Sequence, residues 1–175
     1  MTDSLVIYYS RKGQNYFSGS IRSVTKGNTE YVAEYIAGAV GADIFEIDTV
    51  RPYSVDYTQC TEEAKREKKE DARPELKEYI ADVSGYRNIF VCGPCWWGTF
   101  PMAVFSQLDR LDLKGKNLFA VMTHEGSGLG SSVKDLKRMY PDAAVGDGLA
   151  IGGGSAASSE KEVSAWAKRI VGDAQ

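Results

Sequence analysis

Short apolar runs alternate with longer amphipathic segments along this chain, and that alternation limits the folds it can adopt. A short run that is apolar throughout is typical of a strand covered on both faces of a sheet. A run of this kind predicts a strand at 5–9, and runs that are mostly apolar predict strands at 44–47, 88–92 and 117–122, with a weaker, glycine-interrupted one at 144–151. Strands that alternate with helices indicate an α/β domain with a parallel sheet and right-handed crossovers. A length of 175 residues fits one domain, residues 1–175.

The segments between the expected strands carry helical periodicity. Val32 and Ile36 fall on one face of a helix that Asn28 or Thr29 opens, and Gly41 stands where a left-handed C-terminal cap is expected. Further helices are predicted at 62–79, with a break at Pro74, and at 102–111, 129–140 and 160–171. Residues 11–26 are expected to form a long loop.

Charge and composition argue against several classes of partner. The formal net charge of −3 gives no electrostatic reason to expect nucleic acid or an anionic membrane. No apolar run approaches the roughly 18 to 20 residues that span a bilayer. The first residues lack the basic region and cleavage site of a signal peptide. The cysteine count of 3 is odd, which argues against a secreted disulfide framework. We therefore expect a cytoplasmic protein with no nucleic-acid or membrane partner.

The loop after the first expected strand has the residues of a phosphate site. Ligands of a parallel sheet bind beyond the carboxyl ends of the strands, and this loop lies there. It begins with Ser10 and ends with Gly27, Asn28 and Thr29 at a predicted helix start, where free N–H groups and the helix dipole favour an anion. Alternatively, Asn28 or Thr29 is only a helix N-cap. The chain lacks the P-loop motif GxxxxGK[ST] and has no GxGxxG after this strand.

The loop after the third expected strand, CGPCWWG at residues 92–98, supports two incompatible interpretations. As a CxxC pair, Cys92 and Cys95 would be a thioredoxin-like dithiol, which needs a thiolate at a helix N-terminus. Cys92 instead continues the apolar run, and the next helix is expected only near Met102. As a strand end and an aromatic loop, the segment offers a wall for a flat cofactor. Because Trp96 and Trp97 are adjacent, both cannot point into one core face, so the second interpretation is favoured.

The loop after the fourth expected strand, residues 123–130, is rich in glycine and hydroxyl groups. Its glycines allow the backbone to approach a ligand closely, and small hydroxyls can bond the edge of a heterocycle. His124 is the only histidine of the chain. It is as well explained by a solvated position as by a functional one.

In matching order over nearly the whole chain, these three loops resemble the flavodoxin family. The resemblance rests on Tyr9-Ser10 with residues 27–30 (GNTE), on Pro94 with residues 96–99 (WWGT), and on residues 123–130. It implies a flavodoxin-like, doubly wound, five-stranded parallel sheet of order 2-1-3-4-5 with helices on both faces. It also implies FMN as the cofactor, bound between the ends of the first and third strands.

The resemblance also assigns roles to individual residues. It implies that the FMN phosphate is held by Ser10, Gly27, Asn28 and Thr29, with Arg11, Lys12 or Asn15 as further candidates in the long loop. One side of the isoalloxazine would be lined by Pro94, Trp96, Trp97, Gly98 and Thr99, with Gly98 in a flexible peptide near flavin N5 and Cys95 within reach of the ring. The pyrimidine edge or the ribityl chain would contact Thr123, His124, Gly126, Ser127 and Gly128.

One departure from electron-transfer flavodoxins bears on function. The loop at 123–130 has no aromatic residue to cover the flavin, so one face stays open unless Tyr53 or Tyr57 folds over it. We expect an FMN-binding protein that transfers electrons through the flavin to a redox partner protein or a small quinone-like acceptor. The alternatives are an NAD(P)H-dependent quinone or FMN reductase, a non-catalytic flavin-binding module and a thioredoxin-like dithiol oxidoreductase. No metal site is expected.

Overall fold

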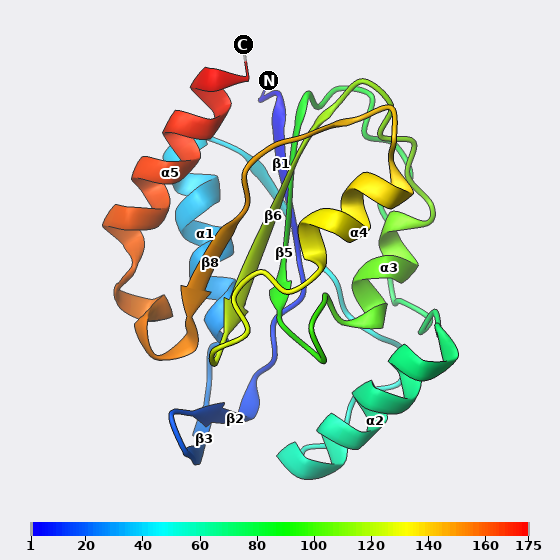
Figure 1. Cartoon of the computed structure of the whole chain (residues 1–175), viewed down its shortest axis with the longest axis vertical. Helices are drawn as coiled ribbons and strands as arrows, with labels where there is room; N and C mark the ends of the chain where they lie inside the picture. Colours follow the sequence, from blue (N-terminus) through cyan, green and yellow to red (C-terminus); the bar gives the residue numbers. More distant parts are fainter. Residues whose placement is uncertain (1, 175) are drawn as a thin grey trace.

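A parallel β-sheet forms the centre of the computed structural model, which describes residues 2–174 (Figure 1). Its strands are β1 (Ser4–Tyr8), β4 (Asp43–Glu46), β5 (Asn88–Pro94), β6 (Asn117–His124), β7 (Ala144–Val145) and β8 (Leu149–Gly152). The spatial order is β4-β1-β5-β6-β7, and β8 also pairs with β6, with every pairing parallel. The α/β prediction and the order 2-1-3-4-5 are confirmed.

The fifth strand is divided in two because its chain passes close to neighbouring side chains. β7 pairs with the first residues of β6 and β8 with the last ones. Between them, a Cβ atom on Gly146 would clash with the Phe119 ring, and one on Gly148 would press against Leu129. The glycines that interrupt the strand pattern are therefore explained by packing.

Helices cover both faces of the sheet, as a doubly wound fold requires (Figure 1). They are α1 (Asn28–Val40), α2 (Tyr57–Glu70), α3 (Met102–Leu108), α4 (Ser132–Met139) and α5 (Glu160–Asp173), with a 3₁₀ turn at Gly153–Ser158. α1 and α5 pack on one face, where Phe90, Phe119 and Trp166 form an aromatic cluster. α3 and α4 cover the other face, against alternate strand residues such as Ile89 and Val91.

α1 follows the predicted pattern, with Val32, Ala33 and Ile36 buried, and Gly41 closes it at φ 67° as expected. Among the described residues, no helix has both the length and the apolar composition that crossing a bilayer needs.

The helix predicted at 62–79 begins and ends earlier than expected. α2 starts after Asp56, whose carboxylate accepts a hydrogen bond from the Gln59 amide at 2.8 Å, and stops at Asp71, which is left-handed. The residues around Pro74 are extended because their backbone pairs with residues 48–50. Val50 N–H donates to the Glu75 carbonyl at 2.9 Å and Lys77 N–H to the Asp48 carbonyl at 2.9 Å.

The prediction of a long loop at 11–26 is wrong, because this segment forms an antiparallel hairpin. Its strands are β2 (Gly13–Phe17) and β3 (Ser20–Val24). Ser18 and Gly19 make the two-residue turn, both with positive φ, as a hairpin turn of this length favours. The hairpin lies beyond the end of the sheet toward which the strand arrows point, the same end at which α2 lies (Figure 1).

Candidate functional site

Two neighbouring cavities lie where the three predicted loops meet α2 and the hairpin. The first, here called the loop cavity, has a volume of about 150 Å³ and is lined by Asn15, Tyr16, Asn28, Tyr57, Pro94, Cys95, Trp96, Thr123, His124, Glu125, Ser127 and Gly153. The second, here called the α2 cavity, has a volume of about 290 Å³ and is lined by Arg11, Tyr57, Cys60, Thr61, Ala64, Cys95, Trp96 and Trp97. Tyr57, Cys95 and Trp96 belong to both. The cavities therefore share a wall and form one composite site.

Ser10 and Gly27 are neighbours in space although residues 11–26 separate them in sequence. A Cβ atom on Gly27 would overlap the Ser10 hydroxyl and the Arg11 carbonyl, so only glycine fits there. The Ser10 hydroxyl also accepts a hydrogen bond from the Glu30 amide at 3.1 Å. The residues on either side of the hairpin are therefore in contact. Ser10 and residues 27–29 lie together, as the flavodoxin resemblance implies for the phosphate loop.

The N-terminus of α1 points at the loop cavity with free donors. Gly27 is the N-cap and has no side chain that could cap the helix, and the Ser10 hydroxyl accepts only from the third amide of the helix, that of Glu30. Among residues 2–174, the backbone N–H groups of Asn28 and Thr29 have no protein acceptor. Free N–H groups and the positive end of the helix dipole attract an anion. Lys12 lies apart from this cavity, near Glu30 and Glu46, and Asn15 lines it.

Thr29 fastens α1 to β6. Its hydroxyl lies 2.8 Å from the Thr123 hydroxyl, and both residues are almost fully buried, at 2% and 3% exposure. Two hydroxyls that share one hydrogen bond satisfy each other without water. This pair fixes the first loop against the third, and it uses up part of the hydrogen-bonding capacity that the sequence assigned to a ligand.

Trp97 and Gly98 form a tight turn with an unusual backbone. Their φ angles are 54° and 86°, and Trp96 N–H donates to the Thr99 carbonyl at 2.9 Å. A left-handed conformation is costly for a bulky residue such as Trp97. α2 holds it there, because Trp97 Nε1 donates to the Thr61 carbonyl at 2.9 Å and Lys68 Nζ donates to the Trp97 carbonyl.

Gly98, predicted to lie in a flexible peptide, is also engaged on its other side. Its carbonyl accepts hydrogen bonds from the Ser131 amide at 2.7 Å and the Ser131 hydroxyl at 3.2 Å. The carbonyls of Trp97 and Gly98 are therefore both hydrogen-bonded. Any rotation of this segment must first break a hydrogen bond to α2 or to the start of α4.

Trp96 stands between the two cavities. Its ring packs edge-on against Tyr9, with centroids 5.2 Å apart, and against Tyr53 at 5.1 Å. Tyr53 is thereby turned away from the loop cavity. Tyr57 faces both cavities and stacks on Tyr16 at 6.1 Å, so it supplies the aromatic wall that the loop at 123–130 lacks.

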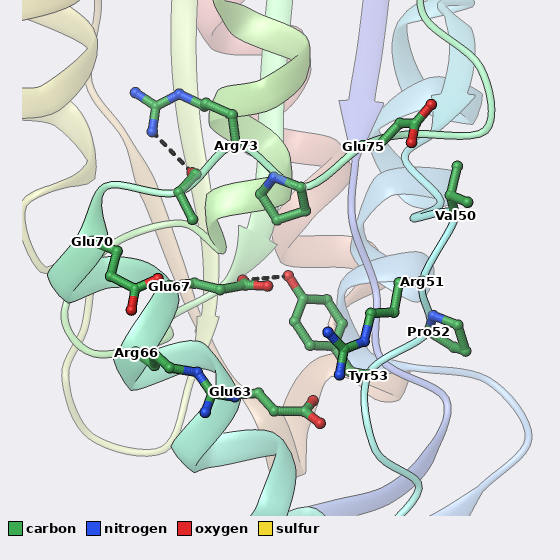
Figure 2. Close-up of a pocket in the computed structure, with 12 residues that line it drawn as sticks. Val50, Arg51, Pro52, Tyr53, Glu63, Arg66, Glu67, Glu70, Arg73 and Glu75 are labelled. Carbon is green, nitrogen blue, oxygen red and sulfur yellow. Dashed lines mark hydrogen bonds between the residues drawn. The ribbon is translucent and has the colours of Figure 1, made fainter.

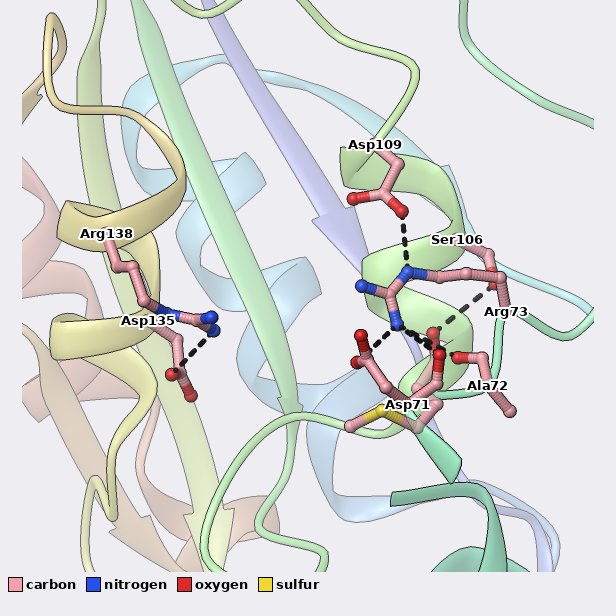
Figure 3. Close-up of polar contacts among 8 residues, drawn as sticks. Asp71, Ala72, Arg73, Ser106, Asp109, Asp135 and Arg138 are labelled. Atoms are coloured by element: carbon pink, nitrogen blue, oxygen red, sulfur yellow. Dashed lines mark hydrogen bonds and ion pairs between the residues drawn. The ribbon is translucent and has the colours of Figure 1, made fainter. Parts of the chain in front are cut away.

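Thr99 does not line either cavity. It is 3% exposed, and its hydroxyl donates to Asp135 Oδ2 at 2.6 Å. The same carboxylate accepts from the Ser131 hydroxyl at 2.8 Å and pairs with Arg138 (Figure 3). Thr99 therefore anchors the aromatic turn to α4 and acts on the site only through that turn.

The third loop contributes backbone and side-chain groups around His124. Gly126 N–H donates to His124 Nδ1 at 2.9 Å, which ties the imidazole to the backbone of its own loop. Glu125 Oε2 accepts from the Ser18 amide at 3.0 Å and ties the loop to the hairpin tip. Ser127 lines the loop cavity, whereas Gly126 and Gly128 shape the loop outside its lining.

The cysteines do not form a thioredoxin-like centre. Cys92 is fully buried in β5, where burial raises the pKa of its thiol, and α3 begins only at Met102. Burial also raises the pKa of Cys95, which is half-buried at the shared wall, and that of Cys60 to about 11. The dithiol chemistry needs a stabilised thiolate, and none of these thiols has one.

α2 is held in place largely by polar contacts on its far side. There a charged cavity of about 380 Å³ is lined by Val50, Arg51, Pro52, Tyr53, Glu63, Arg66, Glu67, Glu70, Ala72, Arg73, Pro74 and Glu75. Within it the Tyr53 hydroxyl donates to Glu67 Oε2 at 2.7 Å (Figure 2), and burial raises the pKa of Glu67. None of the three predicted loops lines this cavity, so it is separate from the candidate site.

Arg73 fastens the end of α2 to α3. Its Nε donates to Asp109 Oδ2 at 2.6 Å and its Nη1 to Asp71 Oδ1 at 2.8 Å (Figure 3). Its guanidinium also lies over the Phe105 ring, 5.6 Å from the centroid. These contacts tie the segment that follows α2 to α3.

Comparison with known proteins places this geometry in a family. The sequence profile described as Flavodoxin matches residues 14–170. The chain belongs to the flavodoxin family. Among curated proteins, none matches this flavodoxin significantly.

Solved structures share the fold over almost their whole length. A protein assigned as a flavoprotein from Bacteroides eggerthii DSM 20697 is 26% identical, with 98% of this chain and 99% of that chain covered at a TM-score of 0.76. A flavoprotein in complex with FMN from Lactobacillus acidophilus NCFM is 17% identical, with 94% and 99% covered at 0.66. Oxidised Flavodoxin 2 from Bacillus cereus is 16% identical, with 97% and 99% covered at 0.56.

The burial of the cysteines generates a prediction on thiol labelling. With Ellman's reagent, we expect the native protein to react only at Cys95, and Cys95→Ser to abolish the reaction. Because burial raises the pKa of Cys95, its thiolate fraction is low near neutral pH, so the labelling rate rises as the pH increases above the ordinary thiol range. Cys92→Ser serves as the control and keeps wild-type labelling. Rapid reaction of Cys92, or formation of a Cys92–Cys95 disulfide, contradicts the assignment.

The buried hydroxyl pair generates a prediction on stability. Thr29→Val leaves the Thr123 hydroxyl without a partner, which costs about 1–3 kcal/mol of unfolding free energy, and Thr123→Val costs a similar amount. In the double variant neither hydroxyl is stranded, so its loss is smaller than the sum of the two single losses. Urea unfolding of all four proteins measures the coupling, and strictly additive losses exclude the hydrogen bond.

Proposed function

We propose that this flavodoxin binds FMN across the loop cavity and transfers electrons through the bound flavin. The observation that carries the proposal is that the free α1 N-terminus, through Asn28, and the aromatic ring of Trp96 line one hollow. FMN has an anionic end and a flat aromatic end, and the hollow offers a group suited to each.

The residues present fit the phosphate. Gly27 brings the backbone close because it has no Cβ, and Asn28 and Thr29 offer free N–H groups. The Ser10 hydroxyl lies beside them; its oxygen accepts from the Glu30 amide, and its own O–H can donate to an oxyanion. Together with the helix dipole, these groups bind a phosphate without needing a lysine or arginine.

The residues present also fit the ring system. Trp96 and Tyr57 provide aromatic walls, and Pro94 and Cys95 provide the floor between them. When bound, FMN supplies the redox chemistry. The protein's part is to bind and orient the flavin, to exclude water with Trp96 and Tyr57, and to present backbone and hydroxyl groups from residues 123–127 to its polar edge.

The α2 cavity favours a small planar acceptor. It opens on the same wall as the loop cavity, so a molecule bound there lies next to the flavin site. Its volume of about 290 Å³ suits a small molecule rather than a polypeptide. This supports an FMN-dependent reductase of small quinone-like compounds.

A second function, electron transfer to a partner protein, is favoured by the rim of the site. Trp97, which lines the α2 cavity, is 45% exposed, and Val55, whose carbonyl accepts from Arg11 Nη2, is 86% exposed. Exposed apolar side chains at a redox site are typical of transient docking surfaces.

The phosphate loop yields a prediction with a matched control. Gly27→Ala forces apart Ser10 and the start of α1, so we expect FMN affinity to fall at least about tenfold. Gly38 lies within the same helix with open space around it, so Gly38→Ala leaves FMN affinity unchanged and stabilises the fold by about 0.5–1 kcal/mol. Fluorescence titration of FMN measures both. Equal affinities for the two variants contradict the assigned phosphate site, and protein that gains no flavin absorbance with FMN refutes the proposed function.

The acceptor is tested by reoxidation of the flavin. FMN-loaded protein is reduced anaerobically with dithionite and mixed with 1,4-naphthoquinone, while the flavin absorbance is followed. A small-molecule reductase is reoxidised directly by the quinone. Oxidation by cytochrome c but not by the quinone identifies a carrier between proteins, and a flavin that cannot be reduced reversibly identifies a non-catalytic binding module.

A further inference from the structure

Arg11 is a buried cation without a buried anion. Its side chain lines the α2 cavity although the residue is only 8% exposed. Nε donates to the Gln14 carbonyl at 2.8 Å, and Nη2 donates to the carbonyls of Ser54 at 2.9 Å and Val55 at 3.3 Å. Within residues 2–174, Nη1 has no oxygen acceptor, and no carboxylate lies within ion-pair distance of this guanidinium.

This arrangement leaves a positive charge available to a ligand. Burying a guanidinium costs several kcal/mol unless its charge is compensated. The three carbonyls satisfy part of the guanidinium but carry no net charge. By contrast, the neighbouring Lys12 is half-exposed and has Glu30 and Glu46 within 3.6 and 3.7 Å. Among residues 2–174, Arg11 alone combines a buried guanidinium, the lack of a carboxylate partner and a cavity in front of it; its one side-chain neighbour there is the neutral thiol of Cys60.

The remaining walls of the α2 cavity are flat and uncharged. Trp96, Trp97 and Tyr57 supply aromatic surface. Cys60, Thr61 and Ala64 follow at helical spacing on the inner face of α2 and leave room because they are small. No acidic residue lines this cavity. The walls therefore accept an aromatic ring, while Arg11 is the single charge that selects among rings.

We propose that the α2 cavity is a binding site for a small planar aromatic molecule that carries a carboxylate or another oxyanion. The oxyanion accepts hydrogen bonds from Arg11 Nη1, and the aromatic ring of the ligand lies against Trp96 and Trp97. Arg11 is thus a specificity residue for the small acceptor and not part of the phosphate site. The proposal deepens the proposed function and rests on it for the ligand's role as electron acceptor.

The test compares 1-naphthoate with 1-naphthamide, two probes of equal shape and different charge, by calorimetric titration of FMN-loaded protein. We expect the wild-type protein to bind the naphthoate at least about tenfold more tightly, because a charge-assisted hydrogen bond replaces a neutral one. Arg11→Gln removes this preference by weakening naphthoate binding about tenfold to hundredfold, and leaves naphthamide and FMN affinities within about twofold. Lys12→Gln, the matched control, leaves all three affinities unchanged.

A second variant protects the test against a folding defect in Arg11→Gln. Ala64→Leu keeps the charge but fills the cavity, so both probes lose affinity while FMN still binds. Equal affinity of the wild-type protein for the two probes overturns the proposal. So does competition of the naphthoate with FMN, or an equal loss of FMN affinity in Arg11→Gln, since either would assign Arg11 to the flavin. Absence of FMN binding in the wild-type protein refutes the proposed function instead, and is recognised separately by the flavin absorbance.

Discussion

The contact between Gly27 and Ser10 is the constraint on which the site depends. It brings the N-terminus of α1 onto the end of β1, within the reach of one hydroxyl, and leaves no space for a Cβ atom. The Thr29–Thr123 hydrogen bond then fixes the first turn of α1 against the end of β6. Because these contacts are short and buried, the free N–H groups of α1 point at a fixed place. The hairpin is inserted between Ser10 and Gly27 without separating them.

The sheet could be predicted from the sequence because a central strand is buried on both faces, so its residues are apolar in succession, as at 89–92. The hairpin could not be found in the same way. β3 is largely exposed, so it has no apolar face to reveal it, and the remaining signal was the pair Ser18-Gly19 at its turn. The end of α2 also depends on residues distant in the sequence, since Val50 N–H donates to the Glu75 carbonyl and Lys77 N–H donates to the Asp48 carbonyl.

The site was predictable where backbone chemistry decides it and less so where side-chain direction does. Glycines and hydroxyl residues before a helix start predicted an anion end, adjacent tryptophans predicted an aromatic wall, and residues of both groups line the loop cavity. Thr99, expected to line the isoalloxazine, turns to Asp135, because a carboxylate from α4 lies within 2.6 Å of its hydroxyl. Arg11, a candidate for the phosphate, turns to the carbonyls that precede α2. Both side-chain directions depend on hydrogen-bond partners far away in the sequence, and hydrophobic periodicity gives no information on such partners.

α2 and the aromatic turn depend on one another. The helix buries only Cys60 and Ala64, too little apolar surface to hold it by packing alone. It is held instead by Trp97, which donates to the Thr61 carbonyl, and by Arg73 at its other end. Trp97 in turn keeps its left-handed backbone because α2 bonds both its indole and its carbonyl. Strain in the turn and placement of the helix are therefore linked. A ligand that pushes on α2 from within the α2 cavity acts at the same time on the aromatic turn, which also borders the loop cavity through Trp96.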